Sequence, residues 1–513
     1  MEKSRKISLP HPAVFVLLAL ILFLSLDLRT RKLVESPGWF VDEGTYLEVS
    51  TRIGNAQLQL GAVNITFVGP HMTHPPLYFA IASIFLKLAQ TDMYSFRLFN
   101  ALIGVMSCLF IFLLGRETGL IERPGERSRL WAEALGLIAA FIFAIHPHAV
   151  MYNRMGLPYN LYLLEAVIIA WFALIYIRKR DFPYCLAACA MAAVALVTVY
   201  YSVVFIPFLF LVILLKGKKK HLWALIIIPL PLMIFLGFMY ISRVPGFIDD
   251  IKALTSAAGT GSLYTTFYHY HEFFQTGITY FLGLAGLFLL RRKHAGWFLF
   301  LLYFLMIHIV LRRQDTIIRF VHYPVIPVLP LVAVGCAAIV LWGWRGLMRA
   351  SPEALVLITC LLGAYLAWGQ VHHGIYGEFQ TPLRFGMTKN IQDTLETGNF
   401  LEKNTDEDDL VLSTPTLWNL FEARNADLVQ ALVFKGKKVG FYKHHFPRER
   451  FLFSPEIESA DYIVLDSFTD EWKKSPSDSP HGPLREAILE IEKNCNFVFS
   501  SGEYRVYANP SIN

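Results

Sequence analysis

The sequence predicts a polytopic α-helical membrane protein that ends in a small soluble α/β domain. Of its 513 residues, 55% are hydrophobic and only 17% are charged, whereas soluble domains carry about 25% charged residues. The mean hydropathy is +0.45. From about Val371 onward, charged residues return and the apolar runs become short. We therefore expect residues 1–370 to lie in and at the membrane, and residues 371–513 to form a separate domain in water.

Long apolar runs predict about eleven membrane spans, each of the length that a bilayer requires. The first run extends from about Pro12 to Leu26 and follows Lys3, Arg5 and Lys6. Because no small-residue cleavage site follows it, we expect an uncleaved anchor with a cytoplasmic N-terminus. An odd number of spans then places the C-terminal domain outside the cytoplasm. The other runs are centred near residues 106, 140, 168, 192, 208, 231, 284, 304, 331 and 361.

Basic loops support this topology because positive charge gathers on the cytoplasmic side of membrane proteins. They also explain the net charge of +6 without a nucleic-acid partner. The alternation holds only if the apolar run from Pro76 to Gln90 does not cross. That run is short for a span and contains Lys87, so we expect a re-entrant or surface-lying helix. The basic loops are Arg116 to Arg129, Arg178 to Arg180, Lys216 to Lys220, Arg291 to Lys293 and Arg345 to Arg349.

The C-terminal segment has the pattern of strands alternating with amphipathic helices. Short apolar runs at Asp409 to Leu412 and Asp461 to Leu465 predict strands. The run from Leu484 to Glu492 has helical periodicity. Asn496 to Phe499 and Tyr504 to Tyr507 flank a glycine and predict a closing hairpin. We therefore expect a small α/β fold here.

An acidic pair, Asp42 and Glu43, follows the first span in the predicted outer loop 29–95. Aromatic residues surround it, namely Trp39, Phe40 and Tyr46. Two carboxylates among aromatics just outside a bilayer indicate chemistry at the membrane surface. The alternative is that Asp42 only caps a short surface helix, because aspartate is a favoured N-cap residue.

Four further motifs follow the acidic pair in a fixed order, and together they carry a resemblance. The chain resembles the GT-C membrane glycosyltransferases of the protein O-mannosyltransferase and lipid A aminoarabinose transferase type. The resemblance covers about residues 35 to 180 well and the tenth span more loosely. It implies transfer of a sugar from a polyprenyl-phosphate donor, on the outer face of the cell membrane, to a protein, lipid, glycan or small-molecule acceptor. The motifs are His74 to Tyr78, Arg97 to Asn100, Tyr152 to Arg154 with Pro158, and Arg319-Phe320 followed by Pro324 and Pro327.

The resemblance implies that Asp42 is the general base. A hydroxyl that attacks an anomeric carbon must lose its proton, and a carboxylate can accept it. Glu43 points to another side of a helix, so we expect it to orient the loop or bind the acceptor. A divalent metal on Asp42 is compatible with its oxygen ligands. However, Leu157 to Asn160 stand where the family often has an acidic residue, and Glu165 lies deeper. Metal ligands therefore stay unassigned, and no other cofactor is predicted.

A phosphate leaving group needs positive partners, and the arginine fork suits phosphate oxygens. Our candidates are Arg319 and Arg97, near the ends of predicted spans. Arg312 and Arg313 are further candidates for phosphate contact, because they lie on the same outer connection as Arg319, against the charge trend. The alternative is an interfacial snorkelling pair. His74 stands where the aminoarabinose transferases have a lysine. Its imidazole is a further candidate for the donor phosphate, with an ordinary surface histidine as the alternative.

Other polar and aromatic residues of the motifs are candidates for substrate contacts. Aromatic rings suit stacking on a sugar, and amide or guanidinium groups suit its hydroxyls. A histidine-rich run from Tyr268 to Glu272 resembles a metal cluster, but without a distant third ligand we favour an aromatic interfacial segment. The candidates for substrate binding are Tyr46, Tyr78, Arg154, Tyr159 and Asn160.

Two other classes of function stay open. A transporter or lipid flippase has a similar number of spans but usually carries polar groups inside its bundle. These spans hold few such groups, chiefly Lys87, Glu165 and His308. A non-catalytic scaffold of the same fold is the second alternative, because the expected second carboxylate is absent from its usual place.

Overall fold

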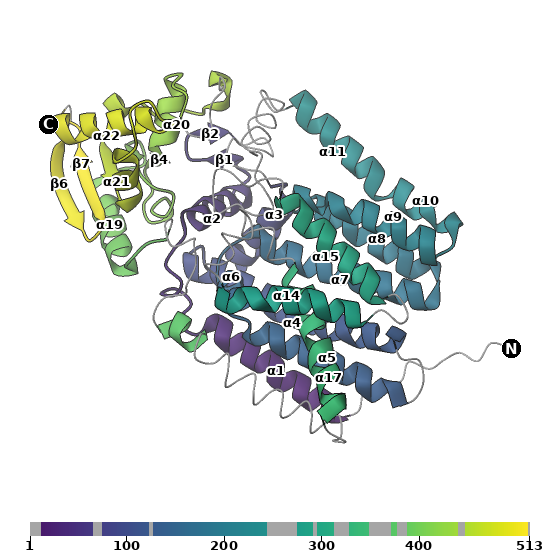
Figure 1. Ribbon diagram of the computed structural model, residues 1–513. Coiled ribbons are helices and arrows are strands. Elements are labelled where there is room, and N and C mark those ends of the chain that lie inside the picture. The colour runs from purple at the N-terminus through teal and green to yellow at the C-terminus, as the bar shows by residue number, and fades with distance from the viewer. Residues whose placement is uncertain are drawn as a thin grey trace.

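The structure is a computed structural model that describes residues 12–64, 74–122, 127–243, 274–290, 295–311, 328–347, 371–376, 387–439 and 447–510. A helical bundle carries an α/β unit at one end (Figure 1). The helices are α1 (Pro12–Thr30), α2 (Val41–Gly54), α3 (Leu77–Leu88), α4 (Met93–Glu122), α5 (Arg127–Ile145), α6 (Pro147–Asn153), α7 (Pro158–Lys179), α8 (Phe182–Leu196), α9 (Phe205–Lys216), α10 (Leu222–Ile227), α11 (Pro229–Arg243), α14 (Phe274–Leu289), α15 (Ala295–Leu311), α17 (Leu329–Leu347), α19 (Ile391–Asn404), α20 (Leu428–Phe434), α21 (Ser467–Lys473) and α22 (Gly482–Asn494). The strands are β1 (Gln59–Leu60), β2 (Val63–Asn64), β3 (Leu410–Leu412), β4 (Arg424–Ala426), β5 (Tyr462–Leu465), β6 (Asn496–Ser501) and β7 (Tyr504–Ala508).

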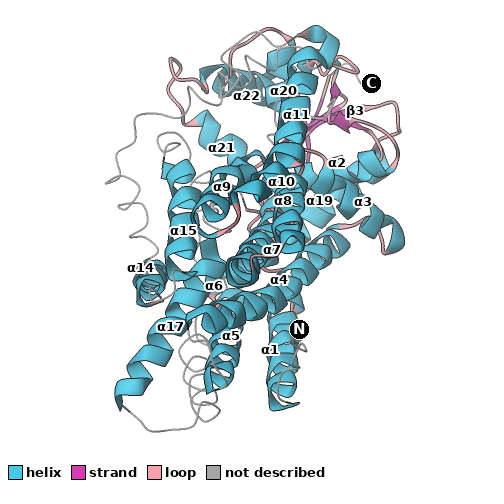
Figure 2. Ribbon diagram, turned by 90° about the vertical axis from the view of Figure 1, so that its right-hand side faces the viewer, coloured by secondary structure: helices cyan, strands magenta, loops and turns pink. Residues whose placement is uncertain are grey.

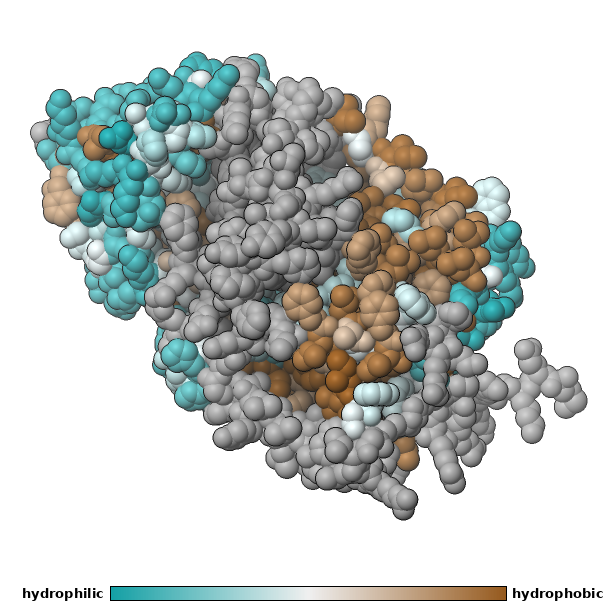
Figure 3. All heavy atoms as spheres, in the orientation of Figure 1, coloured by the Kyte–Doolittle hydropathy of each residue, from teal (hydrophilic) through white to brown (hydrophobic). Residues whose placement is uncertain are grey.

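The helical bundle is that of a multi-pass membrane protein. Among the described residues, four helices are long and apolar enough to cross a bilayer, or five if α5 and α6, which meet at 64°, form one broken span. Apolar side chains gather on the surface of the bundle, whereas the α/β unit is covered by polar ones (Figure 3). Every predicted span centre that falls on described residues lies in a helix, and the run near residue 361 lies outside them. The total of eleven spans and the orientation stay predictions.

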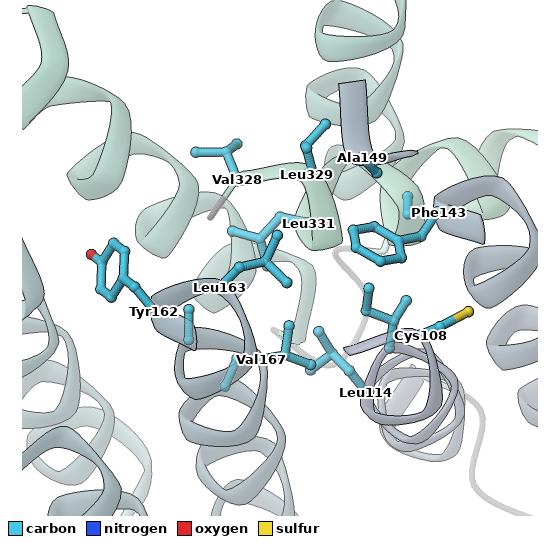
Figure 4. Packing of buried hydrophobic residues seen from close by; sticks show 14 of the residues in the cluster. Cys108, Leu114, Phe143, Ala149, Tyr162, Leu163, Val167, Val328, Leu329 and Leu331 are labelled. Atoms are coloured by element: carbon cyan, nitrogen blue, oxygen red, sulfur yellow. The ribbon is translucent and has the colours of Figure 1, made fainter. Parts of the chain in front are cut away.

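The core of the bundle lies where α4, α5, α7 and α17 meet. Leu114, Phe143, Leu163 and Leu331 come from these four helices and are buried against one another (Figure 4). In lipid the hydrophobic effect contributes little to helix association, so close packing of side chains holds such a bundle together. The predicted site is built on the ends of these helices.

Helices α14 and α17 approach closely through small residues. A Cβ atom added at Gly335 would lie 1.9 Å from the carbonyl oxygen of Gly283, and one added at Gly286 would lie 1.8 Å from that of Gly335. Small residues at such crossings let two backbones touch. Glycine is therefore required at these positions for the observed contact.

Replacing Gly335 by alanine should push α14 and α17 apart and destabilise the bundle by about 1–3 kcal/mol, the usual effect of overpacking. Thermal unfolding in detergent measures this loss. Gly343→Ala, on the same helix, is the matched control, because a Cβ there meets nothing within 4 Å. Equal melting temperatures for the two variants would contradict the packing described here.

Helix α3 is the apolar segment that we expected not to cross. Its 12 residues span only about 18 Å, which is short of the bilayer core of about 30 Å. It packs against α2, and Leu77 N–H donates to the carbonyl of Val197 at 3.0 Å. Ile81, Ile84 and Leu88 are exposed along one side. Both views place α3 beside α2 at the end of the bundle near the α/β unit (Figure 2), as expected for a surface-lying helix.

The C-terminal α/β unit (Ile391–Ala508) has the predicted strands and helix. Its five described strands form one sheet in the order β4-β3-β5-β7-β6, in which β3, β4 and β5 are parallel and β6 and β7 form the predicted hairpin. Only β4 was not predicted, because Arg424–Ala426 lacks an apolar run. The unit has hydrophobic clusters of its own. The exact boundary near residue 371 and the side of the membrane stay predictions.

Candidate functional site

The acidic pair lies in the first turn of α2. The helix begins at Val41, and Phe40 is its N-cap residue with an extended backbone. The Phe40 N–H donates to Glu43 Oε2 at 3.0 Å, so Glu43 supplies the side-chain half of a capping box. Asp42 is therefore inside the helix and does not cap it, which corrects the simpler of our two interpretations. Its side chain is half-buried, whereas Glu43 is fully buried.

Glu43 forms a buried ion pair with Arg97 of α4. Arg97 Nε donates to Oε1 at 2.9 Å and Nη2 to Oε2 at 2.6 Å, and both side chains are 0% exposed. The Gly156 N–H is a second donor to Oε1, at 2.7 Å. A buried pair persists only when further hydrogen bonds satisfy the remaining lone pairs. The Glu43 carboxylate meets this condition, because the Phe40 N–H also donates to it.

Arg97 also binds the loop that precedes α2. Its Nη1 donates to the carbonyls of Leu33 and Pro37, at 3.0 and 2.7 Å, and its Nη2 to that of Gly38 at 2.9 Å. These contacts and the Glu43 carboxylate engage every N–H of the guanidinium. The predicted phosphate contact of Arg97 stays untested, but the side chain has no spare donor in this arrangement.

Arg154 fixes the same loop from its other side. It lies after α6 and is fully buried. Its guanidinium donates to the carbonyls of Leu28, Arg31, Lys32 and Ser36 at 2.6–2.9 Å. It therefore takes up the Leu28 carbonyl in the last turn of α1, one of the groups that a helix end leaves without a helical partner, and three carbonyls of the segment that follows. The predicted substrate contact of Arg154 stays a prediction.

Glu43→Gln should destabilise the protein by about 3–5 kcal/mol, because it leaves the Arg97 charge buried without its counter-charge. Thermal unfolding in detergent or nanodiscs measures this loss. The matched control is Glu471→Gln, which removes an exposed pair with Lys474 and should change stability by less than about 1 kcal/mol. Similar melting temperatures for both variants would show that the pair does not hold the loop.

An aromatic cluster brings three of the predicted site residues together. The ring of His74 meets that of Tyr46 edge-on at 5.7 Å and that of Tyr159 at 5.0 Å, and Tyr46 also packs on Phe79. His74 is only 1% exposed, so it is not the surface histidine of our alternative. Tyr46 follows Asp42 by four residues and therefore shares its face of α2. The cluster thus lies along the face that carries Asp42.

Tyr78 and Asn160 belong to a buried polar network under this cluster. The Tyr78 hydroxyl exchanges hydrogen bonds with the Asn100 amide, at 2.9–3.1 Å. Asn160 donates to Asn100 Oδ1 at 3.1 Å and accepts from Asn153 at 2.8 Å. Asn153 in turn accepts from Arg29 of α1 at 3.0 Å. The network joins α1, α3, α4, α6 and α7, and in this arrangement Tyr78 and Asn160 bind protein groups.

A third carboxylate, Glu48, lies further along α2. It is buried and pairs with Arg52 at 2.8 Å. Burial raises the pKa of Glu48 above its ordinary value, and the Arg52 guanidinium opposes this shift only in part. Of the three acidic residues of α2, Asp42 is thus the least buried and so the most accessible to a substrate.

Two buried histidines that we did not predict lie at the break between α5 and α6. His146 Nε2 contacts Thr279 Oγ1 at 3.0 Å, and His148 Nδ1 contacts the Tyr280 hydroxyl at 3.1 Å. The signal that we overlooked is Pro147 between them, because a proline disfavours helix at the residue before it. A break in a membrane span leaves backbone polar groups without helical partners, so it is tolerated only where it is buried in protein or lines a cavity.

Several predicted groups lie outside the described residues, so the structure does not place them. They include Arg313, Arg319 and the run from Tyr268 to Glu272. Glu165 is described and buried, and its Oε1 accepts from the Thr198 hydroxyl at 2.7 Å. Among the described residues, no three His, Cys, Asp or Glu side chains lie close enough to hold a metal ion. A metal at Asp42 stays a prediction.

Comparisons with known proteins agree with this geometry. Residues 73–242, about a third of the chain, match the family described as dolichyl-phosphate-mannose-protein mannosyltransferase. ArnT from Cupriavidus metallidurans, solved bound to undecaprenyl phosphate, is similar in fold, with a TM-score of 0.60, 14% identity and 98% coverage of both chains. The Archaeoglobus fulgidus oligosaccharyltransferase in its apo form has a TM-score of 0.57 and 13% identity, over 98% of this chain and 75% of that one. No curated protein sequence matches the chain.

The structural similarity to these proteins establishes the fold at low sequence identity. The family match begins just before His74 and ends in α11, so it does not include α2. The predicted resemblance is thereby confirmed: the chain has the fold of the GT-C membrane glycosyltransferases, and its residues 73–242 match the protein mannosyltransferase family.

Proposed function

We propose that the protein transfers a sugar from a polyprenyl-phosphate donor to an acceptor hydroxyl at the extracytoplasmic membrane surface, with Asp42 as general base. The observation that carries this proposal is that the two residues of the acidic pair have different surroundings. Glu43 is buried in an ion pair, whereas Asp42 is half-buried on the helix face that also carries Tyr46. The family match and the fold shared with ArnT support a lipid-phosphate donor.

The reaction balances with the groups named. The acceptor oxygen forms a bond to the anomeric carbon while the bond from that carbon to the phosphate oxygen breaks. The acceptor proton passes to the Asp42 carboxylate, and polyprenyl phosphate leaves with the bonding electrons. A phosphate is a stable leaving anion, so positive or hydrogen-bonding partners are needed more than an acid. Arg319 and Arg313 remain our candidates for that charge, and His74 is a further candidate for the donor phosphate.

Glu43, Arg97 and Arg154 act in this proposal as positioning residues. Their side chains bind the loop before α2 and its first turn, through hydrogen bonds to protein groups. Fixing a base within a few tenths of an ångström matters because a displacement of 1 Å can lower a rate by about 10²-fold. Tyr46 and Tyr159 are our candidates for contacts with the sugar.

Asp42→Asn should abolish general-base catalysis and reduce turnover by about 10²–10⁴-fold, with unchanged thermal stability. Protein in nanodiscs would be incubated with a panel of labelled polyprenyl-phosphate sugars and acceptor-containing membrane extract, and sugar transfer would be counted. Glu48→Gln, the same kind of change two turns along α2, is the control. Turnover that survives in Asp42→Asn would contradict the role of Asp42, and sugar movement without covalent transfer would favour a transporter.

His74→Ala should weaken donor binding, because a hydrogen bond to a charged phosphate contributes about 1.5–3 kcal/mol. We expect the donor KM to rise by roughly 10- to 100-fold and kcat to change less. The comparison is His373→Ala, a change at an exposed histidine, for which KM should stay the same. An unaltered donor KM in His74→Ala would remove His74 from the donor site.

A further inference from the structure

We infer that the C-terminal α/β unit is a positioning element that holds the Asp42 helix from both of its ends. This inference rests on the proposed role of Asp42 and goes beyond it, because it assigns the α/β unit a part in turnover. Three separate contacts join the unit and its leading segment to residues 39–63. Figure 1 shows α2, β1 and β2 lying between the bundle and the unit.

The first contact precedes α2. The Thr388 N–H donates to the carbonyl of Trp39 at 2.9 Å, and the Trp39 N–H donates back to Thr388 Oγ1 at 2.8 Å. Next to this pair, Phe40 and Met387 form an antiparallel β-bridge. The residue directly before the helix is thereby tied to the segment that leads into α19.

The second contact is on the first turn of α2. A Cβ atom added at Gly44 would lie 2.2 Å from the carbonyl oxygen of Pro415, so helix and loop touch through backbone. Pro415 lies just beyond the carboxyl end of β3, the edge where open α/β sheets ordinarily bind ligands. Here α2 occupies part of that edge. Glu43 is thus bound to the bundle and Gly44 packs on the α/β unit, directly after Asp42.

The third contact fastens the β1–β2 hairpin that follows α2. The Ala62 N–H donates to Gln430 Oε1 at 3.0 Å, and Gln430 Nε2 donates to the carbonyl of Leu60 at 3.1 Å. The Leu452 N–H donates to the carbonyl of Ala62 at 2.9 Å. Gln430 is 2% exposed, so its two hydrogen bonds are made away from water, where losing one costs most.

Anchors at both ends restrict how far α2 can shift or tilt. On the bundle side, the helix is held by the Glu43 ion pair near its N-terminus and by packing of its middle part on α3, for example Tyr46 on Phe79. The segment that leads into the α/β unit adds Thr388 before the helix, and the unit itself adds Gln430 after it. Releasing either end should widen the distribution of Asp42 positions without touching the bundle, so kcat should fall more than donor binding.

The experiment uses the full chain in nanodiscs, with Gln430→Ala and Thr388→Val as separate variants. We expect kcat to fall on the order of 10- to 100-fold at an unchanged donor KM. Hydrogen exchange should accelerate at the amides of Ala62 and Trp39, respectively. The matched control is Gln392→Ala, because that side chain bonds only Glu396 on the surface of α19; its kcat and exchange should equal those of the wild type.

Three outcomes would overturn the inference. Unchanged exchange in both variants would show that these contacts do not restrain the loop. Faster exchange with an unchanged kcat would show that the restraint has no part in turnover. A rise in KM matching the fall in kcat/KM would assign the unit to binding instead. A wild-type protein without turnover on any donor is a different result: it refutes the proposed function and the catalytic half of the inference, while hydrogen exchange still decides the mechanical half.

Discussion

The ion pair between Glu43 and Arg97 is the interaction on which the rest of the site depends. Removing two charges from water is expensive, and only a complete set of partners makes such a pair tolerable. Glu43 receives N–H donors from Arg97, Phe40 and Gly156. Arg97 in turn gathers carbonyls from the loop before α2. The helix start, the loop and α4 are thus parts of one hydrogen-bonded assembly, and Asp42 projects from it.

The sequence predicted the fold class and several candidate residues that the structure brings close together, and the reasons are local. Apolar runs of span length identify helices whatever their partners are, and the short run at α3 was recognised by its length and Lys87. The predicted strands β3, β5, β6 and β7 are present because each has an apolar or aromatic run. The acidic pair, His74 and Asn100 were found through motifs, and the structure places them at one end of the bundle.

The hydrogen-bond partners of these residues could not be predicted from the sequence. Arg97 reads as a phosphate ligand because a charged group at a span end suggests function, yet its donors are engaged by carbonyls that no sequence pattern reveals. Arg154 is similar. The spans also contain more buried polar groups than we predicted, namely Arg29, Asn100, Asn153 and Asn160. These groups bind one another, as expected for a rigid scaffold around a site rather than for a path along which a solute moves.

The contact between Gln430 and the β1–β2 hairpin is made entirely with main-chain atoms, at Leu60 and Ala62. An amide side chain that binds backbone does not itself select which residues the hairpin carries. The hairpin is limited by packing instead, because Leu60, Ala62 and Val63 are buried and a Cβ atom at Gly61 would lie 2.6 Å from Gln430 Oε1. Position 430 is thus limited by hydrogen bonding to a residue that both donates and accepts, whereas the hairpin is limited by volume to a glycine flanked by apolar residues.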